Sequence, residues 1–507
     1  MKNYILIGAI FCTAFLGVAR LSAGEIDVIL WFDTEDYLLP ADDDATKRLC
    51  DLLTAHGIRA TFKLVGEKAR VLEKRHRDDV IAALQKHDIG YHSDFHSVHP
   101  TPSEYLAECG FIDGVAEFTR REAKGAADVR RILGVDTLVC YGQPGSSWGC
   151  QAIAALKEIG IAPHGIPCYV DDGSHVGLDE KPFWYCGAIN VYHLGKNTTR
   201  IKDLHDPNAL APAKEKVTEI AERLRAEGGG LISIYYHPCE WVHRQFWDGV
   251  NFSRGANPPA ALWKAPPQRT EAETDAAFAR FGEYIDHIKA IKDVRFVTAS
   301  DLPELYPDKT RVDGAPASDV LPIAERILDE QTKGADMLRL DDRAYSVADQ
   351  FELLTQYANM LMGRKETAQR IRLTTIMGPD SAPPPHSALT KLQFTEFAAA
   401  LRDVTQYLET QHRIPPRVFI GADAIPPADF LTALAGLAVH FQKKGSLPAL
   451  QGVEIRAMEL LPAKHIAEDT PNLFGGWIIH KEGFRAPKIL DVAKLQTWTL
   501  KPAIRGK

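Results

Sequence analysis

The chain has 507 residues, of which 45% are hydrophobic and 25% are charged, and this composition is typical of a globular protein of two or three domains. Its formal net charge is −8 and no strongly basic segment stands out, which argues against nucleic acid as a partner. Beyond the N-terminal segment, no stretch approaches the roughly 18 consecutive apolar residues that a membrane-spanning helix needs.

The first 23 residues have the pattern of a secretory signal peptide. Lys2 precedes a short apolar run over residues 4–18, and small residues follow up to Ala23. We therefore predict an exported protein of the periplasm, cell envelope or extracellular space, with no stable membrane span after signal cleavage. An uncleaved N-terminal anchor is the alternative.

The cysteines give no disulfide framework. Seven of the eight follow the signal segment, none lies beyond Cys239, and no C-x-x-C pattern occurs. Export permits disulfides, so Cys140 and Cys150 are candidates for a loop staple, with separate buried thiols as the alternative.

Residues 25–307 alternate short apolar runs with amphipathic stretches, which predicts a mainly parallel sheet covered by helices. About seven such units in about 280 residues favour a closed or nearly closed β/α barrel, in which chemistry lies at the C-terminal ends of the strands. The predicted strands cover 26–32, 60–65, 88–92, 137–141, 188–192, 231–236 and 294–298. The predicted helices cover 44–56, 67–86, 113–133, 150–159, 213–227 and 271–291.

Polar residues follow four of the predicted strands. Three carboxylates come directly after the first strand, in Phe32-Asp-Thr-Glu-Asp36. His92 and His96 follow the third strand, and their spacing predicts that both lie on one face of a helical turn and reach one metal ion. The fourth strand leads into Tyr141-Gly-Gln-Pro144, and His237 ends a later strand.

These motifs resemble those of the NodB-homology polysaccharide deacetylases, the carbohydrate esterase family 4. The likeness rests on the aspartate-rich element, the His-Ser-x-x-His element, the Pro144-Gly loop and His237, over about residues 25–305. It implies a distorted (β/α) barrel and one divalent metal ion, usually Zn²⁺ and in some members Co²⁺ or Ni²⁺. It also implies hydrolysis of N-acetyl groups on a glycan.

By this resemblance, Asp33 is the general base that takes a proton from water. His237 is the general acid, because an amide nitrogen cannot leave as an anion. The backbone N–H of Tyr141 or a neighbour is a candidate to help hold the oxyanion.

The resemblance also implies that a later aspartate of the first motif is a metal ligand, which places Asp36 beside His92 and His96. In the family the two aspartates are usually adjacent, whereas two residues intervene here. Glu35 is therefore an alternative ligand.

The third motif departs from the family pattern. An arginine that orients the catalytic base usually precedes the proline, but Gly142 and Gln143 stand before Pro144 here. A glutamine can hydrogen-bond a carboxylate but cannot form an ion pair with it. Other candidates to contact the base are Arg120, Arg121 and Lys63.

Five residues near these motifs are predicted to contact the glycan. Their side chains are aromatic or polar, and aromatic rings suit stacking on sugars, although aromatic side chains that form the barrel core give the same sequence pattern. The candidates are Tyr141, Gln143, Pro144, Trp148 and Trp241.

Beyond the barrel we predict a linker over 308–340, a helical repeat domain over 341–449 and a C-terminal extension over 450–507. Ile376-Met-Gly-Pro-Asp and Phe419-Ile-Gly-Ala-Asp align 43 residues apart and each precedes a Pro-Pro pair. The second copy resembles the pseudomurein-binding repeat, which implies attachment to a cell-wall glycan. A helical domain that only buttresses the barrel is the alternative.

The leading interpretation is thus an exported metal-dependent deacetylase acting on a polysaccharide. A metal-dependent hydrolase of another non-peptide C–N bond is the second. A catalytically inactive glycan-binding protein is the third, because the third-motif arginine is missing.

Overall fold

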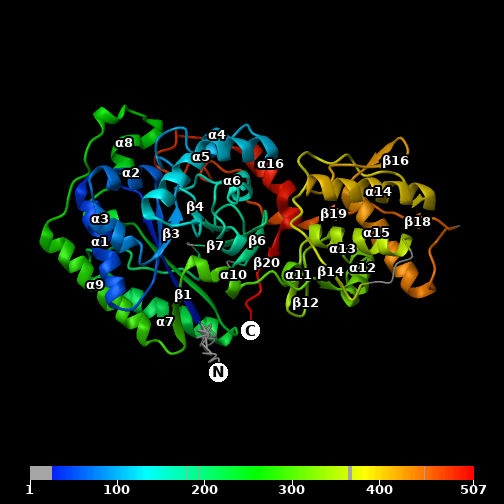
Figure 1. Ribbon diagram of the computed structural model, residues 1–507, viewed down its shortest axis with the longest axis horizontal. Helices are drawn as coiled ribbons and strands as arrows, with labels where there is room; N and C mark the ends of the chain where they lie inside the picture. The colour runs from blue at the N-terminus through cyan, green and yellow to red at the C-terminus, as the bar shows by residue number, and fades with distance from the viewer. Residues whose placement is uncertain (1–25, 180, 193–194, 364–367, 450, 507) are drawn as a thin grey trace, which may run out of the picture.

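Residues 26–300 are largely organised around one curled sheet, shown in Figure 1. The computed structural model describes residues 26–179, 181–192, 195–363, 368–449 and 451–506, so the predicted signal peptide lies outside the described residues. The sheet has the strand order β20-β6-β7-β5-β4-β3-β2-β1-β8, with β9 also pairing β1. The strands are β1 (Ile26–Thr34), β2 (Thr61–Leu64), β3 (Asp88–Tyr91), β4 (Tyr141–Gly142), β5 (Cys168–Asp171), β6 (Phe183–Tyr185), β7 (Ala188–Tyr192), β8 (Gly230–Tyr236), β9 (Val294–Val297) and β20 (Lys501–Pro502).

Strand β1 is the centre of this sheet. All nine of its residues are buried, as expected for a parallel strand covered on both faces. One edge pairs in parallel with β8, and the other pairs with β9 over Ile26–Ile29 and with β2 over Trp31–Thr34. The C-terminal end of β1 therefore lies beside the ends of β2 and β8.

Among the described residues, a short bridge closes the sheet into a barrel. Beyond β7, the carbonyl of Asn197 accepts a hydrogen bond from Ser233 of β8 at 3.0 Å, and Thr199 donates to the carbonyl of Ser233 at 3.3 Å. At the far edge of the sheet, β6 pairs antiparallel with β7, and β20 pairs antiparallel with β6. The predicted distorted (β/α) barrel is confirmed, and its closure is weaker than in a regular barrel.

Helices cover the outside of the sheet, as Figure 1 shows. The predicted helix over 67–86 is two helices, because His76 adopts a left-handed conformation (φ 54°) between them. The helices of this lobe are α1 (Pro40–Ala55), α2 (Gly66–Lys74), α3 (Asp78–Leu84), α4 (Pro102–Leu106), α5 (Phe111–Leu133), α6 (Cys150–Ala155), α7 (Leu210–Ala226), α8 (Trp247–Phe252), α9 (Glu271–Ala290) and α10 (Leu302–Leu305).

A second lobe with its own apolar core begins soon after the barrel. The predicted linker over 308–340 contains α12, whose residues Val320, Ile323 and Ile327 are buried in this core. The linker prediction is therefore wrong: the amphipathic pattern of this segment forms an integral helix. The helices here are α11 (Lys309–Val312), α12 (Val320–Leu328), α13 (Val347–Met362), α14 (Phe394–Gln411) and α15 (Pro427–Lys444), and the two-residue strands are β10 (Ala315–Pro316), β11 (Gly334–Ala335), β14 (Arg370–Ile371), β15 (Lys391–Leu392), β18 (Val453–Glu454) and β19 (Glu459–Leu460).

The second lobe contains a structural repeat, but not at the predicted offset. A hairpin of β12 (Leu338–Leu340) and β13 (Arg343–Tyr345) leads into α13, and a hairpin of β16 (Val418–Ile420) and β17 (Asp423–Ile425) leads into α15. The predicted first copy, 376–384, forms no hairpin. The true counterpart of the second copy is the β12–β13 hairpin. Its turn contains a left-handed Asp341 (φ 53°) where the β16–β17 turn contains Gly421 (φ 60°), so the Gly-x-Asp pattern does not mark it.

The C-terminal extension returns to the sheet lobe. Helix α16 (Pro487–Gln496) contributes Ile489 and Leu490 to the core of the barrel, and β20 adds a strand to its sheet. Figure 1 shows this segment between the two lobes.

The structure bears on the predictions about a membrane span and about a disulfide. Within the described residues, no helix has the length and apolarity to cross a membrane. The seven cysteines that are described carry unpaired thiols, so the staple between Cys140 and Cys150 is absent and both thiols are buried separately.

Candidate active site

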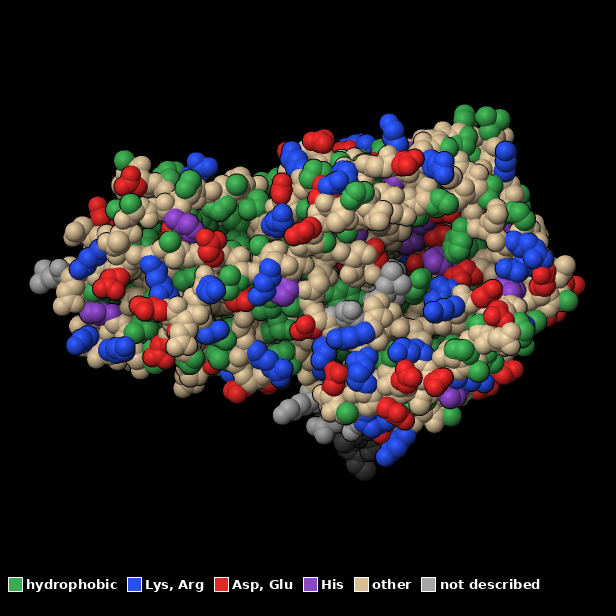
Figure 2. Space-filling view, turned by 180° about the vertical axis from the view of Figure 1, so that it is seen from behind, with side chains coloured by type: hydrophobic (Ala, Val, Ile, Leu, Met, Phe, Trp, Pro, Cys, Tyr) green, Lys and Arg blue, Asp and Glu red, His purple; other side chains and the backbone are tan. Residues whose placement is uncertain are grey.

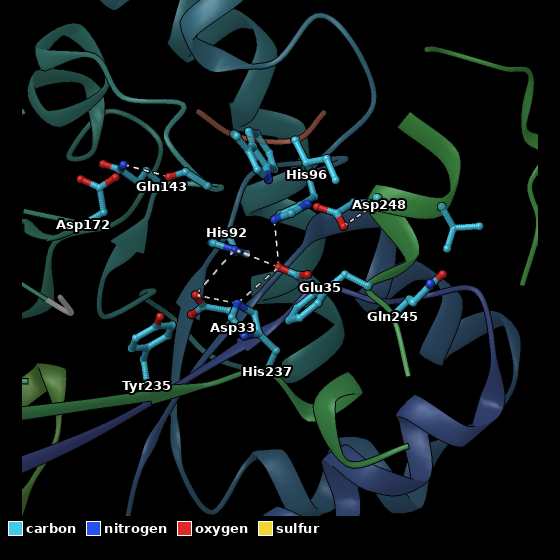
Figure 3. A pocket seen from close by; sticks show the side chains of 16 residues that line it. Asp33, Glu35, His92, His96, Gln143, Asp172, Tyr235, His237, Gln245 and Asp248 are labelled. Atoms are coloured by element: carbon cyan, nitrogen blue, oxygen red, sulfur yellow. Dashed lines mark hydrogen bonds and ion pairs between the residues drawn. The ribbon is translucent and has the colours of Figure 1, made fainter. Parts of the chain in front are cut away.

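A cavity of about 620 Å³ opens at the C-terminal ends of β1, β3 and β8. Figure 2 shows acidic and histidine side chains gathered in this hollow of the sheet lobe. Figure 3 shows that Asp33, Glu35, His92, His96 and His237 point toward one another there. The strand ends of the parallel sheet thus deliver four of the predicted site residues to one place.

One carboxylate and two imidazoles form a compact donor set. Oε2 of Glu35 lies 2.9 Å from Nε2 of His96 and 3.6 Å from Nε2 of His92. These three ligand atoms lie within 4.8 Å of one another, and all three residues are buried. Mixed imidazole and carboxylate sets of this kind suit a divalent transition metal ion.

The histidine pair is held by a loop and not by the predicted helical turn. Ser93 and His96 adopt left-handed conformations (φ 66° and 56°), and the hydroxyl of Ser93 accepts a hydrogen bond from the backbone N–H of His96 at 3.0 Å. The two imidazole rings still approach to 4.9 Å between centroids. The i, i+4 spacing brought the right residues together through a different backbone path.

The hydrogen bonds of His92 leave the atom facing the cavity able to coordinate. Its Nδ1 lies 2.8 Å from the carbonyl oxygen of Gly142, which can only accept, so Nδ1 donates and Nε2 keeps its lone pair. Burial lowers the pKa of His92, and burial also lowers the pKa of His96, to about 4. Both imidazoles are therefore neutral near pH 7, the form that binds metal.

Asp36 is not part of this donor set. Its Oδ2 lies 2.9 Å from Nδ1 of His243, and its Oδ1 accepts a hydrogen bond from the N–H of Leu38. Successive side chains of an extended segment point to opposite faces, so Asp33 and Glu35 share the cavity face while Asp36 turns away. Glu35, the alternative, therefore replaces Asp36 as the candidate carboxylate ligand.

Lys63 occupies the place that the missing arginine was expected to fill. It stands opposite Asp33 in the β1–β2 register, and its Nζ lies 2.6 Å from Oδ1 of Asp33. Both residues are buried. An amine and a carboxylate of opposite formal charge thus face each other away from water, as in the expected arginine pair.

The other candidates for that role lie elsewhere. Arg120 and Arg121 form ion pairs with Glu117, 2.7 and 2.6 Å away, along the outer helix α5. Gln143 lines the cavity, where its side chain donates to the carbonyl of Gly145 and accepts from the hydroxyl of Tyr169.

His237 is fixed from behind by an acidic partner. Its Nδ1 lies 2.7 Å from Oε1 of Glu240, which is paired in turn with Arg200, and its Nε2 lies 3.7 Å from Oδ2 of Asp33. Burial alone would lower the pKa of His237, but Glu35, Glu240 and Asp33 outweigh it and raise the pKa to about 9. The imidazole therefore carries a proton at neutral pH.

Most of the residues predicted to contact glycan are core residues instead. Tyr141, Trp148 and Trp241 are fully buried, and Pro144 is buried outside the cavity lining. Trp241, for example, packs edge-on against Tyr236. Of the five candidates, Gln143 alone lines the cavity. The three aromatic candidates belong to the core, which was the alternative interpretation of their sequence pattern.

Several cavity residues carried no recognisable signal in the sequence. Phe246 immediately precedes α8, Asp248 lies in the first turn of α8, and the C-terminal extension supplies Trp477 and Ile478. The ring of Trp477 lies edge-on to His96 at 5.3 Å between centroids. A Cβ on Gly145 would approach the Trp477 ring to 2.3 Å, so a glycine at position 145 is needed for Trp477 to occupy this place beside His96.

Comparisons with known proteins give matches among solved structures. No protein-family model matches the chain, and no curated protein matches it. Polysaccharide deacetylases are among the solved structures it resembles. A putative polysaccharide deacetylase from Mycobacterium smegmatis aligns at 16% identity and a TM-score of 0.36, over 57% of this chain and 92% of its own.

Two further structures align similarly. The PuuE allantoinase aligns at 13% identity and a TM-score of 0.37, over 57% of this chain and 93% of its own. The Bc1960 peptidoglycan N-acetylglucosamine deacetylase aligns at 16% identity and a TM-score of 0.29, over 56% of this chain and 88% of its own.

Proposed function

We propose that this protein is an exported, metal-dependent hydrolase that removes N-acetyl groups from a polysaccharide, releasing acetate and an amine. The observation that carries the proposal is the convergence of a buried Lys-paired aspartate, a three-residue donor set and a protonated histidine in one cavity. Amide hydrolysis needs a base, an electrophile and an acid in this arrangement.

The residues that would hold the metal ion are Glu35, His92 and His96. One carboxylate and two neutral imidazoles fit Zn²⁺ best, with Co²⁺ or Ni²⁺ also compatible. When bound, such an ion polarises a carbonyl oxygen and makes a water molecule more acidic.

Asp33 would take the proton from the attacking water. Lys63 holds its Oδ1, which leaves Oδ2 directed toward His92 and His237 at the cavity. Because the carboxylate is fixed by a buried ion pair, it needs no rearrangement when the proton moves.

His237 would donate a proton from Nε2 to the departing nitrogen. Glu240 accepts the hydrogen bond from Nδ1, which sets the ring orientation and stabilises the imidazolium. The short separation between Asp33 and His237 would let the base reach the attacking water and the acid reach the departing nitrogen of one tetrahedral centre.

The cavity walls are compatible with a sugar ring. Phe246, Trp477 and Ile478 offer apolar surface, while Gln143 and Gln245 offer amide groups for hydroxyls. Export, through the N-terminal 23 residues, and cell-wall glycan binding by the helical lobe are parts of the same proposal. They rest on the signal-like pattern and on the hairpin–helix repeat.

A hydrolase of a smaller amide is the second candidate. The wall formed by Trp477 and Ile478 closes one side of the cavity beside His96, which favours a compact substrate over a long chain. The inactive glycan-binding alternative was based on the missing arginine. Lys63 supplies a positively charged group beside Asp33 in its place, so that reason for expecting inactivity no longer applies.

The test is metal analysis of the purified protein together with acetate release from chitooligosaccharides, peptidoglycan fragments and small N-acetylated compounds. Bound metal with acetate release from the oligomers supports the deacetylase. Activity on the small compounds alone supports the second candidate. Absence of metal after loading with Zn²⁺ or Co²⁺ would overturn both.

A further inference from the structure

A second cluster of potential ligands lies beside the cavity. Asp171 ends β5, Asp172 follows it, and His175 lies in the next turn. One ligand atom from each of these residues lies within 4.8 Å of the other two, and Nδ1 of His175 is 3.4 Å from Oδ1 of Asp172. None of them belongs to the donor set of Glu35, and Figure 3 shows Asp172 beside Gln143, away from that set.

Buried polar atoms in this cluster are left without hydrogen bonds. His175 is 0% exposed, and within the described part of the chain neither of its ring nitrogens has a hydrogen-bond partner. Asp171 is also 0% exposed, and its Oδ2 likewise has no hydrogen-bond partner among the described residues. Such atoms cost about 1–3 kcal/mol each when nothing satisfies them, so they call for an ion or a water.

Charge argues for a cation over a water. Two adjacent carboxylates are buried here, and among the described residues no Lys or Arg forms an ion pair with Asp171. The two carboxylates lie close together and are shielded from water, so their negative charges would repel each other here. A divalent ion would remove this penalty and take up the free ring nitrogen together.

We propose that Asp171, Asp172 and His175 bind a second divalent transition metal ion. The imidazole disfavours Mg²⁺ and Ca²⁺, which prefer all-oxygen ligands, and favours ions such as Zn²⁺ and Co²⁺. Asp172 lines the cavity, so an ion can enter from that side. This site stands independently of the proposed deacetylase activity.

The second ion would fasten the cavity wall to the C-terminal extension. The carbonyl of His175 accepts a hydrogen bond from Ala467 at 2.9 Å, and Gly177 donates to the carbonyl of His465 at 2.8 Å. The His175 ring also lies 5.1 Å from the ring of Phe474, three residues before Trp477. Ion binding at the β5 turn therefore stabilises the segment that carries Trp477.

The experiment counts metal ions per chain in the full-length protein after chelator treatment, loading with Zn²⁺ and dialysis. The wild type should hold about two ions, H175Q about one, H96Q about one, and H96Q/H175Q none. H87Q is the matched control, because His87 is also a buried histidine but belongs to no donor cluster, and it should hold two.

Thermal unfolding gives a second readout that activity does not enter. Adding chelator to the Zn²⁺-loaded H96Q variant should lower its Tm by about 3 °C or more and leave H96Q/H175Q unchanged. A wild type with one ion, equal to H175Q, would overturn the proposal. If H175Q does not fold, anomalous scattering at the zinc edge from wild-type crystals decides, since a peak between Asp171 and His175 is required.

Discussion

Nζ of Lys63 lies 2.6 Å from Oδ1 of Asp33, and both side chains are buried at adjacent strand ends. This pair replaces the arginine that the third motif lacks. K63M should lower kcat by about 100-fold, because a base without its partner loses orientation and general-base catalysis contributes about 10²–10⁴. Measured metal content should stay at the wild-type value.

The conservative K63R variant separates positioning from folding. Removing one partner of a buried ion pair can cost about 3–5 kcal/mol of stability, so K63M needs a circular dichroism melt beside its kinetics. K63R keeps the charge and should recover part of kcat. Equal turnover in K63M and the wild type would refute the role given to Lys63.

The carboxylate ligand can be identified by comparing two neighbouring substitutions. E35Q should weaken metal binding at the first site at least tenfold, because Glu35 contacts both imidazoles. D36N should retain that metal, since Asp36 faces His243. Titration with Zn²⁺ against a chromophoric chelator measures both, and the reverse ranking would restore Asp36 as the ligand.

Substitutions of Asp33 and of the proposed metal ligands should have different effects on metal content and turnover. D33N should keep the metal and lose turnover by about 10²–10⁴-fold, the range of general-base catalysis. H92A should lose the metal ion of the first site and activity together while the fold persists. Metal analysis and acetate release on the same preparations test this, and full metal content in H92A would disprove the assignment.

Local sequence was sufficient to place Asp33, His92, His96 and His237, because each lies at or within a few residues of the C-terminal end of an apolar strand, and parallel strands end at one edge. The choice of Glu35 over Asp36 depends on how far side chains keep alternating between the two faces of the extended segment. The sequence predicts the end of β1 at residue 32, whereas the strand continues to Thr34, so it does not show which carboxylate faces the cavity.

The remaining site residues come from non-local geometry. The partnership of Lys63 with Asp33 depends on the β1–β2 register, which no single strand reveals. Trp477 reaches His96 from a segment far along the chain. The core positions of Tyr141 and Trp148 could not be distinguished from a binding role, because buried and sugar-stacking aromatics share one pattern.

His237 gives a pH prediction for the metal-free protein. Its pKa is raised to about 9 in the folded state, above an ordinary value of about 6.5. The folded state thus binds the proton more tightly, so the stability from this group is full below about pH 6.5 and is lost as pH rises through about 9.

Glu240 provides the control for that titration. E240Q should lower the pKa of His237, because its Nδ1 partner loses charge. Histidine NMR titration of the metal-free wild type, E240Q and H237Q would assign the resonance. An unchanged titration in E240Q would contradict the pairing.

Trp477 should contribute to substrate binding without touching the metal. W477A should lower kcat/KM for oligosaccharides about tenfold, since one central aromatic contact is worth more than about 1 kcal/mol. Metal content should not change. W263A is the control, because Trp263 packs near Trp247 and does not line the cavity. Equal losses in both variants would point to a folding effect instead.

Lys501 joins the two lobes through a buried ion-pair cluster. Its Nζ lies 2.8 Å from Oδ1 of Asp308 and 2.7 Å from Oδ2 of Asp349, while its backbone forms part of β20 in the barrel sheet. K501M should therefore destabilise the protein by about 3 kcal/mol, the lower end for a broken buried ion pair, because the two carboxylates lose one shared cation and keep Arg311. K494M, at an exposed lysine of α16 that lies 3.6 Å from Asp491, should change stability by only about 0.5 kcal/mol. Urea unfolding measures both free energies, and a loss in K501M no larger than in K494M would show that the lobes are held together by their apolar contacts instead.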